Sequence, residues 1–282
     1  PQALIFNPSN NNIYVANRDS ETVSVIDSTN NTVLKNVTVG SFPQQLLYNP
    51  SNDNIYVANQ ISNSISMIDG QTNEVISEID VGYDPVDLEY SPSNNNIYVA
   101  NSGSETLSVI NGTDNKVIGE IMVGSSPISL ALHPSNNNIY VANRDSGTVS
   151  VVDTSNNKLL STVQVNNEPT TIEHNPSNND IYVSNRGSRT VSVIDDLNST
   201  LLSNVEVGTE PVDLLFNPTN NNMYVANVVS NSVTILDSTN NTVADTIVVN
   251  SLPLALEYNP SNNDVYVAGT LTGTEGVVSI IG

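Results

Sequence analysis

The sequence of 282 residues contains no cysteine and no tryptophan, and only 7 of its residues are lysine or arginine. Without cysteine there is no disulfide framework, no thiolate metal ligand and no cysteine nucleophile. The basic residues stand against 29 aspartates and glutamates, which gives a formal net charge of −22. Nucleic-acid backbones are bound by clustered positive charge, so this balance excludes DNA and RNA as expected partners.

Long hydrophobic runs are also lacking. No run of about 18 apolar residues occurs, so we expect no membrane-spanning helix, and the basic and apolar start of a signal peptide is missing. The chain opens with Pro1 rather than methionine, and we therefore expect a processed or excised piece of a longer precursor. With 38% hydrophobic residues, the chain can be globular if these residues are well placed.

The apolar residues follow an internal repeat of 42 residues. A tetrad centred on tyrosine recurs at this step, with Tyr14, Tyr56, Tyr98, Tyr140, Tyr182, Tyr224 and Tyr266. A proline opens every copy, at Pro1, Pro43, Pro85, Pro127, Pro169, Pro211 and Pro253. The units are 1–42, 43–84, 85–126, 127–168, 169–210, 211–252 and the shorter 253–282. No linker separates them, so we expect one domain over 1–282.

Each unit contains four short runs of β-forming residues, which in the first unit are 3–6, 13–16, 22–26 and 32–39. Clusters of Asn, Ser, Pro and Asp form turns between the first two runs and between the last two. A sheet whose strands are apolar on both faces must be covered on both sides, here by copies of itself. The sequence therefore predicts an all-β fold, a seven-bladed β-propeller of four-stranded antiparallel blades.

This pattern resembles the YVTN repeat. In the first unit it comprises Asn-Pro-Ser-Asn at 7–10, Tyr-Val-Ala-Asn at 14–17, Thr-Val-Ser-Val-Ile-Asp at 22–27 and a closing Val-Gly at 39–40. The resemblance covers essentially the whole chain. It implies a seven-bladed propeller of the kind found in archaeal surface-layer and other secreted proteins. The chain departs from the consensus where Ala16 or Ser184 replaces Thr and where Asn-Asn replaces the Asp-Gly of the first turn.

The seventh unit departs most from the pattern. Gly269 replaces the final Asn of the tetrad, and aligning 278–280 with 23–25 requires three extra residues in the loop 270–276. Gly282 falls where a third strand would end, so we expect this blade to lack its fourth strand. Either a strand resembling 32–40 lies upstream of Pro1 in the precursor, or the blade has three strands. Strand exchange with a neighbouring copy, leading to polymerisation, is a further alternative.

Signatures of catalysis are few. His133 and His174 fall in or at the end of first strands, among packing and turn residues, and we interpret both as structural. No Gly-x-Ser-x-Gly motif and no glycine-rich phosphate loop occurs. Because the strand residues change little between units, we expect no enzyme and no cofactor. The favoured function is a noncatalytic extracellular or cell-surface module that acts as a scaffold or adhesion domain.

Carboxylates gather on the first strands, which line the central channel of a propeller. The third and fifth positions of these strands carry Asp87, Glu89, Glu173, Asp213 and Glu257. If these side chains converge at one mouth of the channel, they offer oxygen ligands suited to calcium. The alternative is a solvated acidic funnel without a specific ion. A bound cation would favour a second function, that of a cation-dependent enzyme or small-ligand binder at the channel mouth.

One face of the predicted propeller carries most of the fixed charge of both signs. Its charged loop residues are Asp84, Glu168 and Glu210 before first strands, and Arg18, Arg144, Arg186 and Arg189 between second and third strands. Strand direction places both sets of loops on the same face. This patch either contacts a partner, for which we expect other cell-surface proteins or glycans, or holds local salt bridges worth about 0–1 kcal/mol each.

The opposite face carries the turns that are rich in asparagine and serine. N-glycosylation sequons occur at Asn30, Asn36, Asn111, Asn198 and Asn240, and are compatible with a secreted glycoprotein. The repeated tyrosines are interpreted as blade packing rather than a sugar-stacking ladder. Aspartates that end third strands, such as Asp27, are expected to cap the following turn.

Overall fold

The computed structural model describes residues 1–271 and 275–282, and nearly all of its regular structure is β-strand. Seven consecutive sheets follow the seven sequence units as the blades of a seven-bladed β-propeller. Six sheets have four strands in sequential order, and the last has three within the described residues. The predicted fold, including the short last blade, is confirmed. No helix in the described ranges has the length and apolar character needed to cross a bilayer.

The chain groups into two compact units, Pro1–Ile139 with Val152–Leu159, and Tyr140–Val151 with Leu160–Gly282. A single domain over 1–282 stays a prediction. The first unit holds blades one to three, with strands β1 (Ala3–Asn7), β2 (Asn12–Asn17), β3 (Thr22–Asp27), β4 (Thr32–Thr38), β5 (Pro43–Asn49), β6 (Asn54–Asn59), β7 (Ser64–Asp69), β8 (Val75–Asp80), β9 (Pro85–Ser91), β10 (Asn96–Asn101), β11 (Thr106–Asn111) and β12 (Lys116–Met122).

Blade four draws residues from both units, with β13 (Pro127–Leu132), β14 (Asn138–Asn143), β15 (Thr148–Asp153) and β16 (Lys158–Gln164). The second unit holds the remaining blades. Their strands are β17 (Pro169–His174), β18 (Ile181–Asn185), β19 (Thr190–Asp195), β20 (Thr200–Glu206), β21 (Pro211–Asn217), β22 (Asn222–Asn227), β23 (Ser232–Asp237), β24 (Thr242–Val248), β25 (Leu252–Asn259), β26 (Asp264–Leu271) and β27 (Glu275–Ile281).

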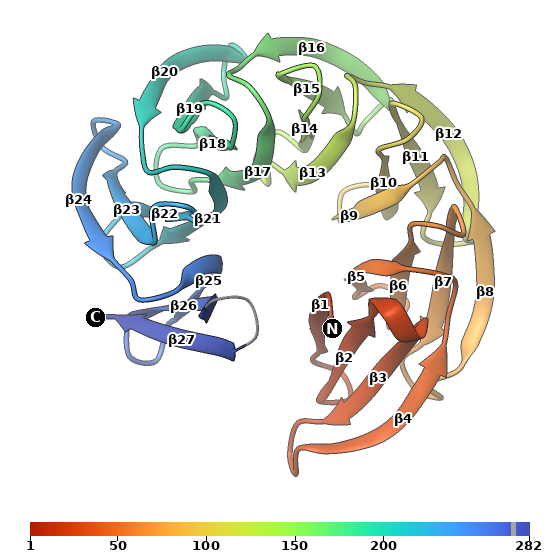
Figure 1. Cartoon of the computed structure of the whole chain (residues 1–282). Helices are drawn as coiled ribbons and strands as arrows, with labels where there is room; N and C mark the ends of the chain where they lie inside the picture. Colours follow the sequence, from red (N-terminus) through yellow and green to blue (C-terminus); the bar gives the residue numbers. More distant parts are fainter. Residues whose placement is uncertain (272–274) are drawn as a thin grey trace. The chain divides into compact units, whose positions relative to one another are not determined.

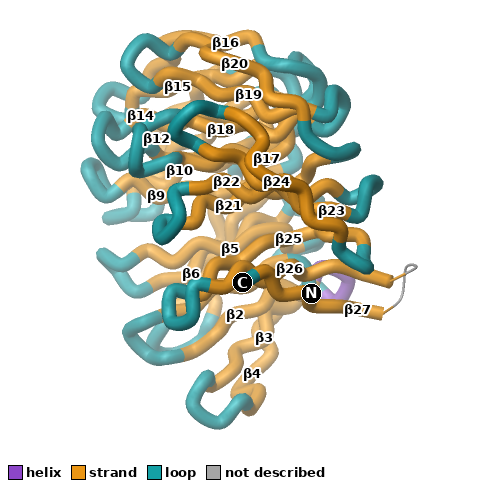
Figure 2. Tube along the Cα trace, turned by 90° about the vertical axis from the view of Figure 1, so that its left-hand side faces the viewer, coloured by secondary structure: helices purple, strands orange, loops and turns teal. Residues whose placement is uncertain are grey.

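First strands of successive blades lie side by side. In the first unit β1 contacts β5 and β5 contacts β9, while β4, β8 and β12 lie at the far side of their sheets (Figure 1). In the second unit the same relation joins β17 to β21 and β21 to β25. The strands of each blade run alongside one another, and the turns lie at their two ends (Figure 2). First-strand side chains of neighbouring blades are thereby brought together.

The turns form because their polar side chains satisfy backbone groups. In the turn after β3, Asp27 Oδ1 accepts hydrogen bonds from the Thr29 backbone N (2.8 Å) and the Thr29 hydroxyl (2.6 Å). These bonds hold the pKa of Asp27 below its ordinary value. Asn31 then adopts a left-handed backbone with φ 58°, which asparagine tolerates better than most residues. The predicted capping role of Asp27 is confirmed.

The blades pack face to face through the repeated tyrosines. Tyr14, Val23 and Val25 of blade one pack with Leu46 and Ile55 of blade two. The hydroxyl of Tyr14 also donates to Asn73 Oδ1, at 2.5 Å, in the next blade's last turn. Tyr14, Tyr56, Tyr98, Tyr140 and Tyr182 are fully buried. Their interpretation as blade packing is confirmed.

Candidate functional site

The predicted calcium ligands of the first unit, Asp87 and Glu89, lie on β9 and are half-buried. Asp87 Oδ1 accepts from the Leu88 backbone N (2.9 Å), and Oδ2 accepts from the backbone N of Leu130 on β13 (2.7 Å). Gln45 Nε2 on β5 donates to Oδ1 at 3.5 Å. Burial raises the pKa of Asp87 to about 6, and burial with the Asp87 charge raises that of Glu89 to about 8. Asp87 therefore joins the first strands of three blades.

Two of the three predicted ligands of the second unit, Asp213 and Glu173, are also half-buried, whereas Glu257 on β25 is exposed. Asp213 on β21 accepts a hydrogen bond from the Leu256 backbone N on β25, at 2.7 Å. Burial raises its pKa to about 6, while burial and the nearby Asp213 and Glu257 charges raise the pKa of Glu173 to about 7. Across residues 1–271 and 275–282, no group of three acidic or histidine side chains is arranged to hold a metal. The calcium site stays a prediction that the geometry does not support.

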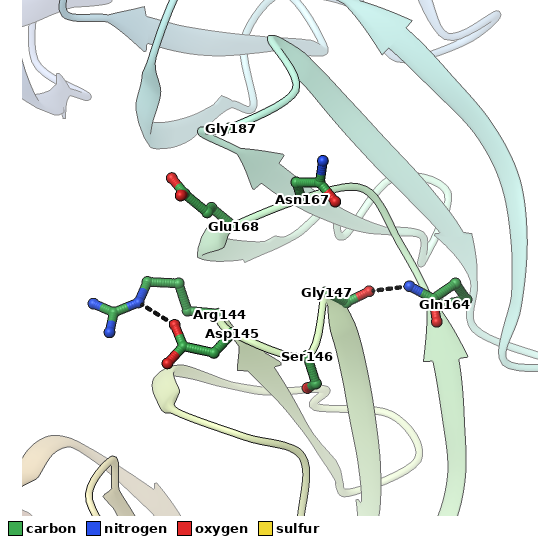
Figure 3. A pocket seen from close by; sticks show the side chains of 8 residues that line it. All are labelled: Arg144, Asp145, Ser146, Gly147, Gln164, Asn167, Glu168 and Gly187. Carbon is green, nitrogen blue, oxygen red and sulfur yellow. Dashed lines mark hydrogen bonds and ion pairs between the residues drawn. The ribbon is translucent and has the colours of Figure 1, made fainter.

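A polar pocket lies in the second unit where three loops meet. Arg186 N donates to Glu168 O (2.9 Å) and Gly187 N to Asn167 O (3.2 Å), which fastens the loop entering β17 to the loop after β18. A Cβ atom on Gly187 would lie 3.2 Å from Glu168 Cγ, so glycine permits this close approach. The pocket measures about 510 Å³ and is lined by Arg144, Asp145, Ser146, Gly147, Gln164, Asn167, Glu168 and Gly187 (Figure 3).

A second pocket of about 460 Å³ shares Glu168 and Gly187 with the first, and is otherwise lined by Arg186, Arg189, Thr209 and Glu210. We call the two together the double pocket. Arg144 Nε pairs with Asp145 Oδ1 at 2.9 Å, and Arg186 Nη2 pairs with Glu210 Oε2 at 2.6 Å. Arg189 is exposed and forms no ion pair with any described residue. Three of the chain's four arginines thus line one site.

The double pocket lies where the loops break the symmetry of the blades. In blades one to six the residue immediately before the third strand has a left-handed backbone. At the step of 42 residues this position holds Glu21, Asn63, Glu105, Gly147, Arg189 and Asn231. In blades one and three, Glu21 and Glu105 accept hydrogen bonds from Ser41 Oγ (2.8 Å) and Ser125 Oγ (2.7 Å). Blade four has no side chain there, and blade five has the opposite charge. The register of the repeat contained this signal, and our sequence analysis missed it.

Two residues of the predicted charged face do not line the double pocket. Arg18 and Asp84 belong to the first unit, where the Arg18 guanidinium stacks 4.4 Å from the Phe42 ring centre. The prediction that charged loop residues gather on one face is therefore supported for the residues that line the double pocket, Arg144, Arg186, Arg189, Glu168 and Glu210. His133 is buried, and its Nδ1 accepts from the Ser135 backbone N at 3.2 Å, which confirms a structural role.

The sequon asparagines are largely engaged in turn contacts. The Nδ2 atoms of Asn30, Asn198 and Asn240 donate to the aspartate that ends the preceding strand, at 2.7 to 3.0 Å. These are the nitrogen atoms that a glycan would modify. Glycosylation, an extracellular location and cell-surface partners all stay predictions.

Comparison with protein families supports the propeller. A family model described as YNCE-like beta-propeller matches residues 3–96, about a third of the chain. It does not support the more specific archaeal surface-layer type. No curated protein matches the sequence.

Two solved structures of enzymes resemble the chain. Kuenenia stuttgartiensis hydrazine synthase matches with TM-score 0.77 and 17% identity, over 100% of this chain and 95% of that chain. Dihydro-heme d1 dehydrogenase NirN, in complex with DHE, matches with TM-score 0.84 and 13% identity over 98% of this chain, which spans 62% of that chain. At such identities the likeness establishes the fold alone. It nevertheless contradicts the prediction of a noncatalytic chain, because regular blades occur in enzymes and are no argument against catalysis.

Proposed function

We propose that the chain is the ligand-binding propeller of an enzyme, and that the double pocket binds a small molecule carrying a carboxylate. The observation that carries this proposal is the gathering of Arg144, Arg186 and Arg189 at one site in a chain of net charge −22. The hydrazine synthase and NirN propellers support the association with an enzyme.

The chemistry of the site fits a carboxylate better than a cation. A guanidinium presents paired N–H donors that match the two oxygens of a carboxylate. Arg186 directs both Nε (3.1 Å) and Nη2 (2.6 Å) to Glu210 Oε2, which holds its plane in place, and Arg189 is left for the ligand. The oxygens of Asp145 and Glu168 can accept hydrogen bonds from hydroxyl or ammonium groups elsewhere on the ligand.

Calorimetric titration tests the proposal, with succinate, glutamate and inorganic phosphate as probes. We expect succinate or glutamate to bind with a Kd in the micromolar to millimolar range, and Arg189→Glu to weaken binding at least tenfold, about 1.4 kcal/mol. Gly147→Glu should also weaken it, because the side chain fills the first pocket. Glu21 and Glu105 already adopt the same backbone conformation, so this change should leave the fold intact.

The matched control is Glu105→Gln, at the equivalent position of blade three, which should leave the Kd unchanged. Equal affinity of the parent and Arg189→Glu would contradict the proposal. So would binding of phosphate alone, since a phosphate preference means a different ligand class.

A further inference from the structure

A third pocket of the second unit lies at the junction of β24, β25 and β26. It measures about 430 Å³, and Val248, Val249, Leu252 and Leu271 contribute to its walls. Val248 is 75% exposed and Leu271 is 38% exposed, so aliphatic surface faces solvent here. In contrast to the double pocket, none of the described residues that line it is charged. We call it the aliphatic pocket.

The aliphatic pocket occupies the same place in the repeat as the first pocket of the double pocket, two steps of 42 residues further along the chain. Val248 falls at the step of Gln164, and Leu252 at the step of Glu168. A polar and a charged side chain at one junction between blades are therefore replaced by aliphatic side chains at the other. The two junctions share a place in the blade and differ in the chemistry that they offer to a ligand.

Hydrogen bonds connect the double pocket to the aliphatic pocket. Thr209 lines the double pocket, and its backbone N donates to the hydroxyl of Ser230, which lines the aliphatic pocket, at 2.7 Å. The backbone N of Val229 donates to Thr209 O at 3.2 Å, and the Val229 side chain is 54% exposed. Exposed aliphatic side chains therefore begin at the edge of the double pocket and continue into the aliphatic pocket.

We propose that the two sites bind one ligand, an alkyl carboxylic acid, with its carboxylate at Arg189 and its alkyl chain across Val229 in the aliphatic pocket. This assignment rests on the proposed function, because the double pocket is the carboxylate site, and it specifies the rest of the ligand. The guanidinium supplies paired donors for the carboxylate. The alkyl chain removes the apolar surface of Val248 and Leu271, and its own, from water.

Calorimetric titration with butyrate, octanoate and octan-1-ol tests this inference on the full chain. We expect octanoate to bind at least tenfold more tightly than butyrate, because each fully buried methylene group increases affinity by about fourfold. Octan-1-ol has no carboxylate to pair with Arg189, so it should bind at least tenfold more weakly than octanoate.

Val248→Gln tests the aliphatic pocket itself. The first pocket already has Gln164 at this place in the repeat, so the blade should accept the change. Affinity for octanoate should fall at least threefold, while affinity for butyrate should stay within twofold of the parent. Met122→Gln is the matched control: Met122 is 63% exposed at the equivalent position of blade three, in the first unit, and this change should leave octanoate binding within twofold of the parent.

The outcomes separate this inference from the proposed function. Equal affinity for butyrate and octanoate would overturn the inference and leave a carboxylate site at the double pocket. Octanoate binding that is insensitive to Val248→Gln would do the same. Octan-1-ol binding as tightly as octanoate would also overturn the inference, since the carboxylate would then play no part. Failure of both carboxylates to bind would overturn the inference together with the proposed function.

Discussion

The protein is expected to lose stability as the pH rises from about 5 to 8.5. The pKa values of Asp87 and Asp213 are raised to about 6, that of Glu173 to about 7 and that of Glu89 to about 8. In the unfolded chain these carboxyls titrate near pH 4. Between those limits the folded state binds more protons than the unfolded state, so its stability falls as pH rises. Below about pH 4 stability instead decreases as the pH falls, because turn aspartates such as Asp27 have lowered pKa values in the folded state.

The size of the effect follows from the shifts. One pKa unit corresponds to about 1.4 kcal/mol of stability. Because the side chains are only half-buried and solvent screens their charges, we expect only a small part of the full shifts to be realised, a combined loss of about 3 kcal/mol. That lowers the unfolding temperature by roughly 5 to 10 °C. Differential scanning calorimetry at pH 5 and pH 8.5 measures it.

Glu89→Gln isolates the largest shift. The amide cannot ionise, so the variant should exceed the parent in unfolding temperature at pH 8.5, and the difference should shrink at pH 5. Glu206→Gln, on an exposed position of β20, serves as the matched control and should follow the parent at both pH values. An unfolding temperature of the parent that does not change between the two pH values would refute the prediction.

The fold was predictable because every level of the sequence agrees. The 42-residue step, the turn asparagines and aspartates, and the two-sided apolar strands all specify the same blade. Asp27 shows the local part of this agreement, since its partner Thr29 is two residues away. The short last blade was predictable for the same reason: the register of the repeat places 278–280 on the third strand.

The site was predictable only in part, because its contacts depend on how successive blades align. Asp87 was correctly placed on a first strand, but its Oδ2 accepts a hydrogen bond from the Leu130 backbone N, 43 residues away. No local spacing reports that bond. Gly147 and Arg189 could have been found from the sequence. Aligning the repeats places them at the position that holds Glu21 and Glu105 in other blades, so the change of residue is visible there. The strand positions change little from blade to blade, and the signal lies in the loop positions where the blades differ.

Truncation of a repeat tyrosine should cause the largest loss of stability of any single change considered. Tyr56 is fully buried and packs with Leu88, Ile97 and Val99 of the next blade. Tyr56→Ala leaves a cavity between two blades, and we expect it to reduce the free energy of unfolding by about 3–5 kcal/mol. Chemical denaturation with urea, monitored by tyrosine fluorescence, measures this difference.

The hydroxyl and the ring of Tyr56 make separable contributions. Tyr56→Phe keeps the ring but leaves Asn115 Oδ1 and Asn52 Nδ2, at 2.6 and 3.0 Å from the hydroxyl, without this partner. We expect a loss of about 1–3 kcal/mol, the cost of buried polar groups left unsatisfied. Tyr83→Ala is the matched control: Tyr83 is 67% exposed, and its loss should change stability by no more than about 0.5 kcal/mol. If Tyr56→Ala were as mild as Tyr83→Ala, the blades would not be held together through these tyrosines, because a residue locked between two sheets cannot be removed without cost.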